Sequence, residues 1–217
     1  MSGFIVHTVP GSPFARAVLA CLEEKALPWR LAPLAPGGHR SAEHLARHPF
    51  ARMPAIEHDG FALYETQAIL RYIDRVQPSP PLTPADPRLA ARMDQAMNVN
   101  DWYLFADCIA VIGFHRLVAP RLLGLEPDEA AIAASMPRAR IVFAELSRLL
   151  ADQPGFAGAD ISLADLLIAP QLDFIATTPE WDELTAGHAN LLRWLERMRR
   201  RPSLRATAWD SLAAGRT

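Results

Sequence analysis

Glu65 and Thr66 are polar residues at a position where a helix is expected to begin. They stand just before a run in which apolar residues recur at helical spacing, from Ile69 to Val76. The unpaired N–H groups and the dipole of a helix N-terminus attract anions and polar groups. A carboxylate and a hydroxyl placed there indicate either helix-start chemistry or contact with a polar ligand.

Ser12 stands at a second expected helix start. Serine is a preferred N-cap residue and proline is favoured at the first helical position, so Ser12-Pro13 predicts a helix beginning here. Val18, Leu19 and Leu22 give this helix an apolar side, while residues 23–25 (Glu-Glu-Lys) are expected to be solvated. Taken alone, the N-cap interpretation is sufficient to explain Ser12.

Cys21 and Cys108 are the two cysteines of the chain, and they form no disulfide framework. This composition fits a reducing compartment. Cys21 lies inside the first expected helix and Cys108 on the apolar stripe of a later one, so both are expected to behave as small buried apolar residues. Neither occupies the position of Ser12.

Residues 161–166 (Ile-Ser-Leu-Ala-Asp-Leu) carry the sharpest local signal in the second half of the chain. Ser162 and Asp165 form a capping box, with Ile161 and Leu166 at the two positions of a hydrophobic staple. The helix that follows is apolar nearly all round, which predicts burial. We assign this motif to folding and give it no catalytic role.

The elements that must position Ser12 and Glu65 read as a small α/β domain. Short apolar runs at 4–6 and 29–31 flank the first helix, which favours a parallel strand pair with a right-handed crossover. Residues 36–49 are irregular with one short helix. Asp59-Gly60 then predicts a two-residue hairpin turn between two strands, because both positions of that turn want φ > 0.

A proline-rich stretch divides the chain. Residues 78–87 (PSPPLTPADP) cannot form a helix or a central strand and predict a stiff, extended linker. Beyond it the pattern is helical, with apolar residues three or four apart from Leu89 to Ile112 and one slip near Asn100. The predicted fold class is α+β: an α/β domain at 1–77, a linker at 78–88 and an all-helical domain at 89–217.

The overall composition excludes several function classes. The chain has 217 residues and a formal net charge of −2, so no general field for nucleic acid or membrane binding is expected. The N-terminus has no positively charged n-region followed by a long apolar run, so we expect no signal peptide. No segment is expected to be long enough to span a bilayer.

Four motifs in this order resemble those of the cytosolic glutathione S-transferases, and the resemblance covers essentially the whole chain. The motifs are Gly11-Ser12-Pro13-Phe14-Ala15-Arg16-Ala17-Val18, His48-Pro49-Phe50-Ala51-Arg52-Met53-Pro54, Glu65-Thr66-Gln67-Ala68-Ile69 and Ser162-Leu163-Ala164-Asp165. The resemblance implies a thioredoxin-like domain followed by an all-helical domain, a cytoplasmic location and a detoxifying role. The first motif is similar to the phi and theta classes, but Ser-Pro-Phe also resembles the tau and omega classes, so the class stays open.

The chain departs from the family pattern at four positions. Ala51 replaces a glycine, Met53 a valine, Thr66 a serine and His48 an asparagine. The first three keep the chemistry or size class, so they bear on specificity more than on binding.

The resemblance implies a glutathione site. Pro54 would be the cis-proline of the fold, and the Met53 backbone would face the cysteinyl part of glutathione. Glu65 and Thr66 would hold the γ-glutamyl amine and carboxylate. The remaining implied contact, to the glycyl carboxylate, is assigned to His39 with Arg40 or Arg52.

Ser12 would donate a hydrogen bond to the glutathione sulfur. A thiol near pKa 8.5 is only about 3% thiolate at pH 7, and the thiolate is the nucleophile. Lowering the pKa by about two units needs roughly 2.7 kcal/mol. One donor to a charged acceptor supplies about 1.5–3 kcal/mol, so neither a metal nor a general base is required. Arg16, by contrast, is interpreted as surface charge or a structural ion pair.

A small hydrophobic electrophile would be the second substrate. The aromatic cluster of Trp102, Tyr103, Phe105 and Phe114 is expected to belong mainly to the core, with some of it lining the electrophile pocket together with Phe14. The resemblance also implies a homodimer, with Phe50 as an anchor in the partner. Peroxide reduction or isomerisation on the same thiolate, and a non-catalytic binding module, are the alternatives.

Overall fold

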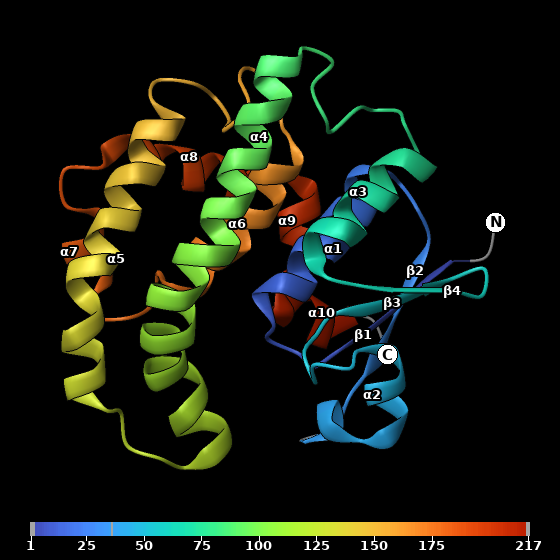
Figure 1. Ribbon diagram of the computed structural model, residues 1–217, viewed down its shortest axis with the longest axis horizontal. Helices are drawn as coiled ribbons and strands as arrows, with labels where there is room; N and C mark the ends of the chain where they lie inside the picture. The colour runs from blue at the N-terminus through green and yellow to red at the C-terminus, as the bar shows by residue number, and fades with distance from the viewer. Residues whose placement is uncertain (1–2, 36, 216–217) are drawn as a thin grey trace. The chain divides into compact units, whose positions relative to one another are not determined.

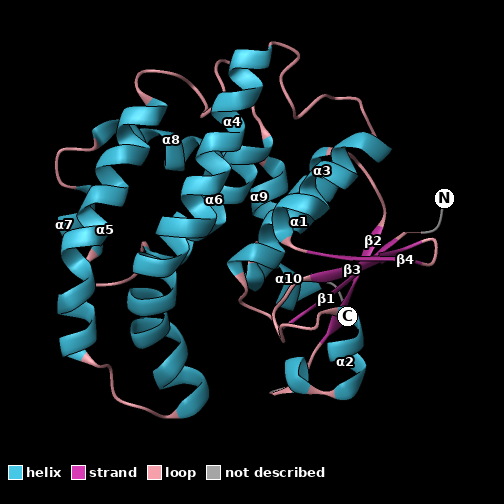
Figure 2. Ribbon diagram, in the orientation of Figure 1, coloured by secondary structure: helices cyan, strands magenta, loops and turns pink. Residues whose placement is uncertain are grey.

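The computed structural model describes residues 3–35 and 37–215. Contacts between Cα atoms divide the chain into two compact units, Met1–Thr83 with Arg199–Thr217, and Pro84–Met198. All strands of the described chain belong to the first unit (Figure 2). Pro36, the first residue of the stretch predicted to be irregular, lies outside the described residues.

The first unit is a four-stranded sheet with helices (Figure 1). Its elements in chain order are β1 (Phe4–Thr8), α1 (Pro13–Glu24), β2 (Trp29–Pro33), the 3₁₀ turn η1 (Gly38–Arg40), α2 (Ala42–Arg47), β3 (Ala55–His58), β4 (Phe61–Tyr64) and α3 (Thr66–Val76), followed near the C-terminus by α9 (Pro202–Ala206) and α10 (Trp209–Gly215). The strand order is β2-β1-β3-β4, with β1 and β2 parallel and the other neighbours antiparallel. The predicted parallel pair and hairpin are therefore confirmed.

The hairpin turn has the backbone that its sequence demands. Asp59 has φ 49° and Gly60 has φ 79°, so both central residues are left-handed. The ladder on either side runs from His58↔Phe61 to Ala55↔Tyr64. This register determines which strand ends lie together at each end of the sheet.

The two faces of the sheet are covered differently. Phe4 and Val6 are fully buried, and the Phe4 ring packs 6.2 Å from that of Tyr72 on α3. Because successive strand residues point to opposite faces, Ile5 and His7 face the other way. On that face His7 lies 3.0 Å from Glu57, which also accepts a hydrogen bond from Arg47 of α2. An apolar layer thus covers one face and a polar network the other.

The C-terminal segment belongs to the first unit rather than to the helical one, which differs from the predicted boundary at residue 89. Arg201 makes a two-pronged ion pair with Glu24 of α1 at 2.9 Å. Arg16 donates from Nη2 to the carbonyl oxygen of Leu204 at 3.0 Å. The structural interpretation of Arg16 agrees with this contact.

Lys25 corrects the expectation that residues 23–25 are solvated. Its side chain is fully buried and its ammonium lies 2.5 Å from Asp74. Asp74 also accepts from the Leu82 amide at 3.0 Å and from the Thr83 hydroxyl at 2.6 Å. The cause is tertiary, since a charge can be buried when it is paired and hydrogen-bonded. The proline-rich stretch is consequently docked onto α3 through Leu82 and Thr83, in its middle.

The second unit is helical. Its elements are α4 (Pro87–Val99), the π-helix η2 (Asn100–Leu123), α5 (Glu129–Leu150), α6 (Leu163–Ile175), α7 (Trp181–Thr185) and α8 (Ala189–Arg200), the last of which runs on into the first unit. Asp86 caps α4 by accepting from the amides of Arg88 and Leu89, both at 2.9 Å. Helix α6 is buried along nearly its whole length, as predicted.

The slip in periodicity near Asn100 marks a change of helix type. The chain passes there from α4 into η2, whose bonding pattern spans five residues instead of four. The buried side of η2 runs through Leu104, Cys108 and Ile112, while Trp102 and Tyr103 are 72% and 53% exposed. The expectation of a core role is therefore wrong for Trp102 and Tyr103, because they lie outside the buried stripe of η2.

The combined helix Pro87–Leu123 has 37 residues and an 18-residue window of mean hydropathy 1.4, of which 39% is buried. By length and composition it could cross a membrane, so the expectation that no segment is long enough is wrong. The core helix of a soluble protein passes the same test, and η2 packs against α5 and α6.

Candidate active site

Four chain segments leave the sheet at the same end. The register aligns His7 with Ala55 and Ala55 with Tyr64, and it pairs Thr8 with Pro33. The ends of β1, β2 and β4 and the beginning of β3 therefore share one edge of the first unit. The segments that continue from that edge carry all the residues predicted to bind glutathione or its thiol, namely Ser12, His39, Arg40, Arg52, Met53, Pro54, Glu65 and Thr66.

Ser12 is the N-cap of α1, as predicted. Its backbone is extended (φ −67°, ψ 118°), Pro13 follows at the first helical position, and its Oγ accepts from the amide of Ala15 at 3.3 Å. A serine hydroxyl carries one donor and two acceptor sites, so this cap leaves the O–H for another partner. The capping role and a thiol-contacting role are thus compatible at the half-buried Ser12.

The Met53–Pro54 peptide bond is cis. Pro54 is buried and Met53 half-buried at the start of β3, while Arg52 is exposed. Just before them, Ala51 is left-handed (φ 52°) and its amide donates to the His48 carbonyl at 3.0 Å. The loop thus takes, at Ala51, a conformation that favours glycine.

Glu65 has an unusual backbone for a residue with a side chain. It adopts φ 69° and ψ 115°, and its side chain makes no capping hydrogen bond to α3. Helix α3 begins at the next residue, Thr66, which is 7% exposed. Non-glycine residues in sparsely populated conformations cluster at ligand-binding sites, where the strain is offset by the surroundings. The Glu65 side chain is exposed and does not cap the helix, so its carboxylate is accessible to a ligand.

His39 and Arg40 lie in η1, between β2 and α2. His39 is half-buried and Arg40 is exposed. Partial burial lowers the pKa of His39, and the positive charge of Arg40 lowers it further. His39 is consequently poised to be neutral at pH 7, which leaves Arg40 and Arg52 as the cations of this edge.

Three histidines near the site are buried: sequence reasoning named His48 without predicting its burial, and it assigned nothing to His7 and His44. His7, His44 and His48 are 8%, 0% and 2% exposed, and the His48 ring lies 4.7 Å from that of Tyr64. Burial lowers the pKa of His7 and of His48. Strand alternation from Phe4 to His7 was the available signal for His7; nothing in the local pattern marked His44.

The predicted electrophile-pocket residues fall in different units. Phe14 is half-buried in the first turn of α1, in the first unit. Trp102, Tyr103 and Phe105 belong to η2 of the second unit, and Phe105 is half-buried. Their joint role stays a prediction.

The cysteines behave as expected, since both are free and buried. Burial raises the pKa of both thiols, that of Cys108 to about 12. Neither is a thiolate nucleophile in this state. Across residues 3–35 and 37–215, no group of three or more histidine, cysteine or acidic side chains could hold a metal ion.

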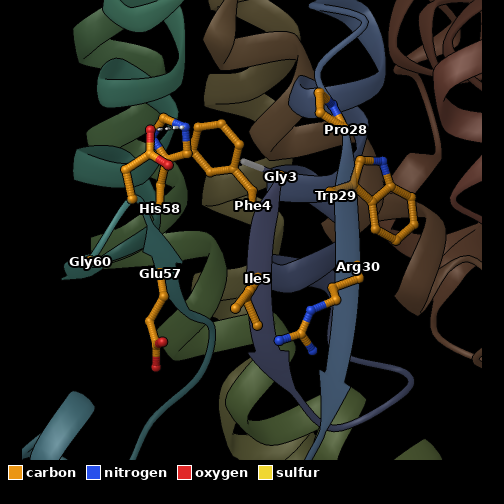
Figure 3. Close-up of a pocket in the computed structure, with 10 residues that line it drawn as sticks. Gly3, Phe4, Ile5, Pro28, Trp29, Arg30, Glu57, His58 and Gly60 are labelled. Atoms are coloured by element: carbon orange, nitrogen blue, oxygen red, sulfur yellow. Dashed lines mark ion pairs between the residues drawn. The ribbon is translucent and has the colours of Figure 1, made fainter. Parts of the chain in front are cut away.

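A cavity of about 430 Å³ lies at the opposite end of the sheet (Figure 3). It is lined by the beginnings of β1 and β2, the end of β3 and the hairpin turn. There His58 stacks on Phe4 with ring centroids 3.9 Å apart and bonds the Tyr72 hydroxyl at 2.9 Å. None of the predicted site residues lines this cavity.

Comparison with known proteins agrees with the fold. Residues 6–81 match the family model for the glutathione S-transferase N-terminal domain, and residues 129–197 match that for the C-terminal domain. Among similar curated proteins, the glutathione S-transferase hmp2 of Hypomyces subiculosus is 31% identical over 91% of this chain and 96% of its own length. A probable glutathione S-transferase of Oryza sativa subsp. japonica is 28% identical, covering 88% of each chain.

Among solved structures, glutathione transferase F7 from Populus trichocarpa superposes with a TM-score of 0.86 and is 28% identical, covering 96% of this chain and 99% of that one. The family models over residues 6–81 and 129–197 and these similarities over most of the chain lead to one assignment. The chain belongs to the glutathione S-transferase family.

Proposed function

We propose that this glutathione transferase lowers the pKa of the glutathione thiol at Ser12, and that the resulting thiolate attacks a small hydrophobic electrophile. One observation carries the proposal: the strand register brings the segments with Ser12, Met53 and Glu65 to a single end of the sheet. A ligand with a thiol, a peptide backbone and a charged terminus can be met there by a hydroxyl, a backbone and a carboxylate.

The Ser12 hydroxyl would donate to the sulfur. Its oxygen accepts from the Ala15 amide, and this cap leaves its proton available to donate to the sulfur. A donor favours the charged form of the acceptor, and the N-terminus of α1 adds about 0.3–1 kcal/mol in the same direction. The thiol proton is released to solvent. The carbon–sulfur bond then forms as a leaving group departs with its electron pair, or as a double bond or epoxide opens to an anion that takes a proton from solvent.

The rest of glutathione would be held by groups spaced around the same edge. Glu65 and Thr66 would bind the γ-glutamyl amine and carboxylate, which gives the strained backbone of Glu65 a function. The Met53 backbone would pair with the cysteinyl residue. His39, with Arg40 or Arg52, would meet the glycyl carboxylate.

The electrophile would lie against the aromatic residues of η2 in the second unit, and the pocket role of Phe14 in the first unit stays a prediction. The exposure of Trp102 and Tyr103 supports this, because large aromatic side chains left uncovered are available to bind an apolar substrate. Peroxide reduction and isomerisation need the same thiolate and remain variants of this chemistry.

A thiol titration tests the proposal. Ultraviolet thiolate absorbance is followed against pH with glutathione bound, for the native protein and for Ser12→Ala. We expect a bound-thiol pKa about two units below the free value and a return upward in the variant. Tight binding with an unshifted pKa would instead identify a non-catalytic binding module, and no binding would refute the site assignment.

We also infer a homodimer in which Phe50 is an anchor. Phe50 is 68% exposed, although its ring contacts those of His48 and Tyr64 with centroids 6.3 Å away in each case. A large exposed aromatic is enriched at interfaces. Sedimentation at micromolar concentration should give twice the chain mass, and Phe50→Ala should shift the equilibrium to monomer; a monomeric native protein would refute the inference.

A cytoplasmic detoxifying enzyme without a metal fits these features. Both cysteines are reduced in the structure, and the net charge of −2 gives no attraction to nucleic acid or to an anionic membrane. The apolar helix Pro87–Leu123 would serve the helical unit, since η2 packs against α5 and α6.

A further inference from the structure

His44 is a fully buried histidine in the middle of α2. Its Nε2 lies 2.7 Å from the carbonyl oxygen of Arg52. A carbonyl oxygen can only accept, so Nε2 carries the proton and the ring is the donor. Nδ1 is buried and has no hydrogen-bond partner within the described chain. The imidazole is therefore oriented by its contact with Arg52.

This hydrogen bond connects two segments with different assigned tasks. Helix α2 follows η1, which carries His39 and Arg40. Arg52 immediately precedes Met53, whose backbone is assigned to the cysteinyl part of glutathione. The bond therefore joins the glycyl side of the site to its cysteinyl side.

Backbone hydrogen bonds also link His44 to the residues between α2 and Met53. The Ser41 hydroxyl accepts from the His44 amide at 3.2 Å, which fixes the start of α2. The His44 carbonyl accepts from the His48 amide at 2.8 Å, and the His48 carbonyl accepts from the Ala51 amide at 3.0 Å. The turn from α2 to Met53 is thus closed by these two amides over residues 44–51 and by the imidazole at Arg52, the last residue before Met53.

We propose that His44 is a positioning residue, which holds the Met53 backbone in the conformation that binds glutathione. This inference rests on the proposed function. It predicts an effect on glutathione affinity and not on thiol activation, because Ser12 belongs to another segment, at the start of α1.

The test compares His44→Phe, His44→Gln and His58→Phe with the native protein. Phenylalanine keeps a ring but removes the donor, and glutamine restores an N–H donor near the Nε2 position. His58→Phe is the matched control: His58 is a 6% exposed histidine of the same unit, with one ring nitrogen bonded to Tyr72, but it lies at the other end of the sheet.

The measurements are the calorimetric Kd for glutathione, the bound-thiol pKa and the thermal midpoint. We expect His44→Phe to raise Kd about tenfold, the loss of roughly one hydrogen bond, with the bound-thiol pKa unchanged. His44→Gln should stay within about threefold of the native Kd on the same scale. His58→Phe should lower the thermal midpoint and leave Kd unchanged.

Two results separate failure of this inference from failure of the proposed function. Native protein that binds no glutathione refutes the proposed function, and the inference falls with it. Native protein that binds while His44→Phe binds equally well refutes the inference alone. An equal rise of Kd in His44→Phe and His58→Phe also refutes it, because the effect would then be one of general stability.

Discussion

Helices in both units begin at polar residues, but these residues differ in how much of their hydrogen-bonding capacity the chain itself uses. At α6, Asp165 is fully buried and accepts from the Ser162 amide, the Ser162 hydroxyl, the Phe156 amide and the Trp194 indole, all within 2.7–3.0 Å. At α1, Ser12 accepts a single amide, and at α3, Glu65 caps nothing. A cap saturated by its own chain serves folding, while a cap with hydrogen-bonding capacity left over can serve a ligand.

The space around the caps of α6 and α1 also differs. A Cβ on Gly155 would lie 3.0 Å from both carboxylate oxygens of Asp165, so no other residue fits there without a shift. A Cβ on Gly11, next to Ser12, would meet nothing within 4 Å. The cap of α6 is closed off, and the cap of α1 is open on the side of the preceding loop.

The largest effect is expected from removing the saturated cap of α6. Asp165→Ala leaves four buried donors without an acceptor, so we expect unfolding free energy to fall by about 3–5 kcal/mol. Ser12→Ala, the matched change at the open cap, should cost only about 1 kcal/mol. Urea unfolding of both variants measures the difference, and similar losses would refute the contrast between the two caps.

An effect of intermediate size is expected from replacing Glu65, which caps nothing at the start of α3. Glu65→Gly should relieve the strained backbone and raise unfolding free energy by about 1 kcal/mol, after the entropic cost of glycine. The same change removes the carboxylate, so glutathione affinity should fall. Ala151→Gly is the control, since Ala151 is also left-handed (φ 49°) but lies in the second unit. It should stabilise without changing affinity; a Glu65→Gly variant with native affinity would contradict the binding role.

The smallest effect is a pH dependence that the histidines of the first unit contribute. Burial lowers the pKa of His7 and His48, with Arg47 and His44 adding to the effect on His7, Glu57 opposing it, and His44 and Arg52 adding to the effect on His48. The unfolded chain titrates near pH 6.5. Stability from the neutral rings is thus complete above about pH 6.5 and is lost as pH falls below it toward the folded pKa values.

Urea unfolding at a series of pH values between 7.5 and 5 measures this loss. His48→Asn, which restores the family residue, should flatten the dependence. The pKa of Glu57 is lowered chiefly by its hydrogen bond with Arg47, so its own contribution is lost only at lower pH, as pH falls below about 4.5. A variant as pH-sensitive as the native protein would show that His48 is not the group involved.

Much of the fold followed from local patterns. The turn at Asp59-Gly60, the caps at Ser12 and Ser162, and the buried helix after Leu163 all depend on neighbours within a few residues. The periodicity slip at Asn100 was visible, but its cause, the change to a π-helix, was not. Trp102 and Tyr103 are exposed because they lie outside the buried stripe of Leu104, Cys108 and Ile112.

The candidate site was assembled from sequence only by resemblance. Ser12, Met53 and Glu65 are more than ten residues apart from one another, and the strand register alone brings their segments to one end of the sheet. His44 was missed because its role depends on the Arg52 carbonyl, a backbone group with no signature in the sequence.

By itself the sequence determined the local elements: where helices start, where the chain turns and where prolines forbid regular structure. These choices depend on dihedral preferences and short-range hydrogen bonds, which residue types specify directly. The tertiary structure decided which polar groups are buried, including Lys25 against Asp74 and His44 against Arg52. Burial of a charged or polar side chain depends on a partner distant in sequence, because only that partner offsets the loss of water.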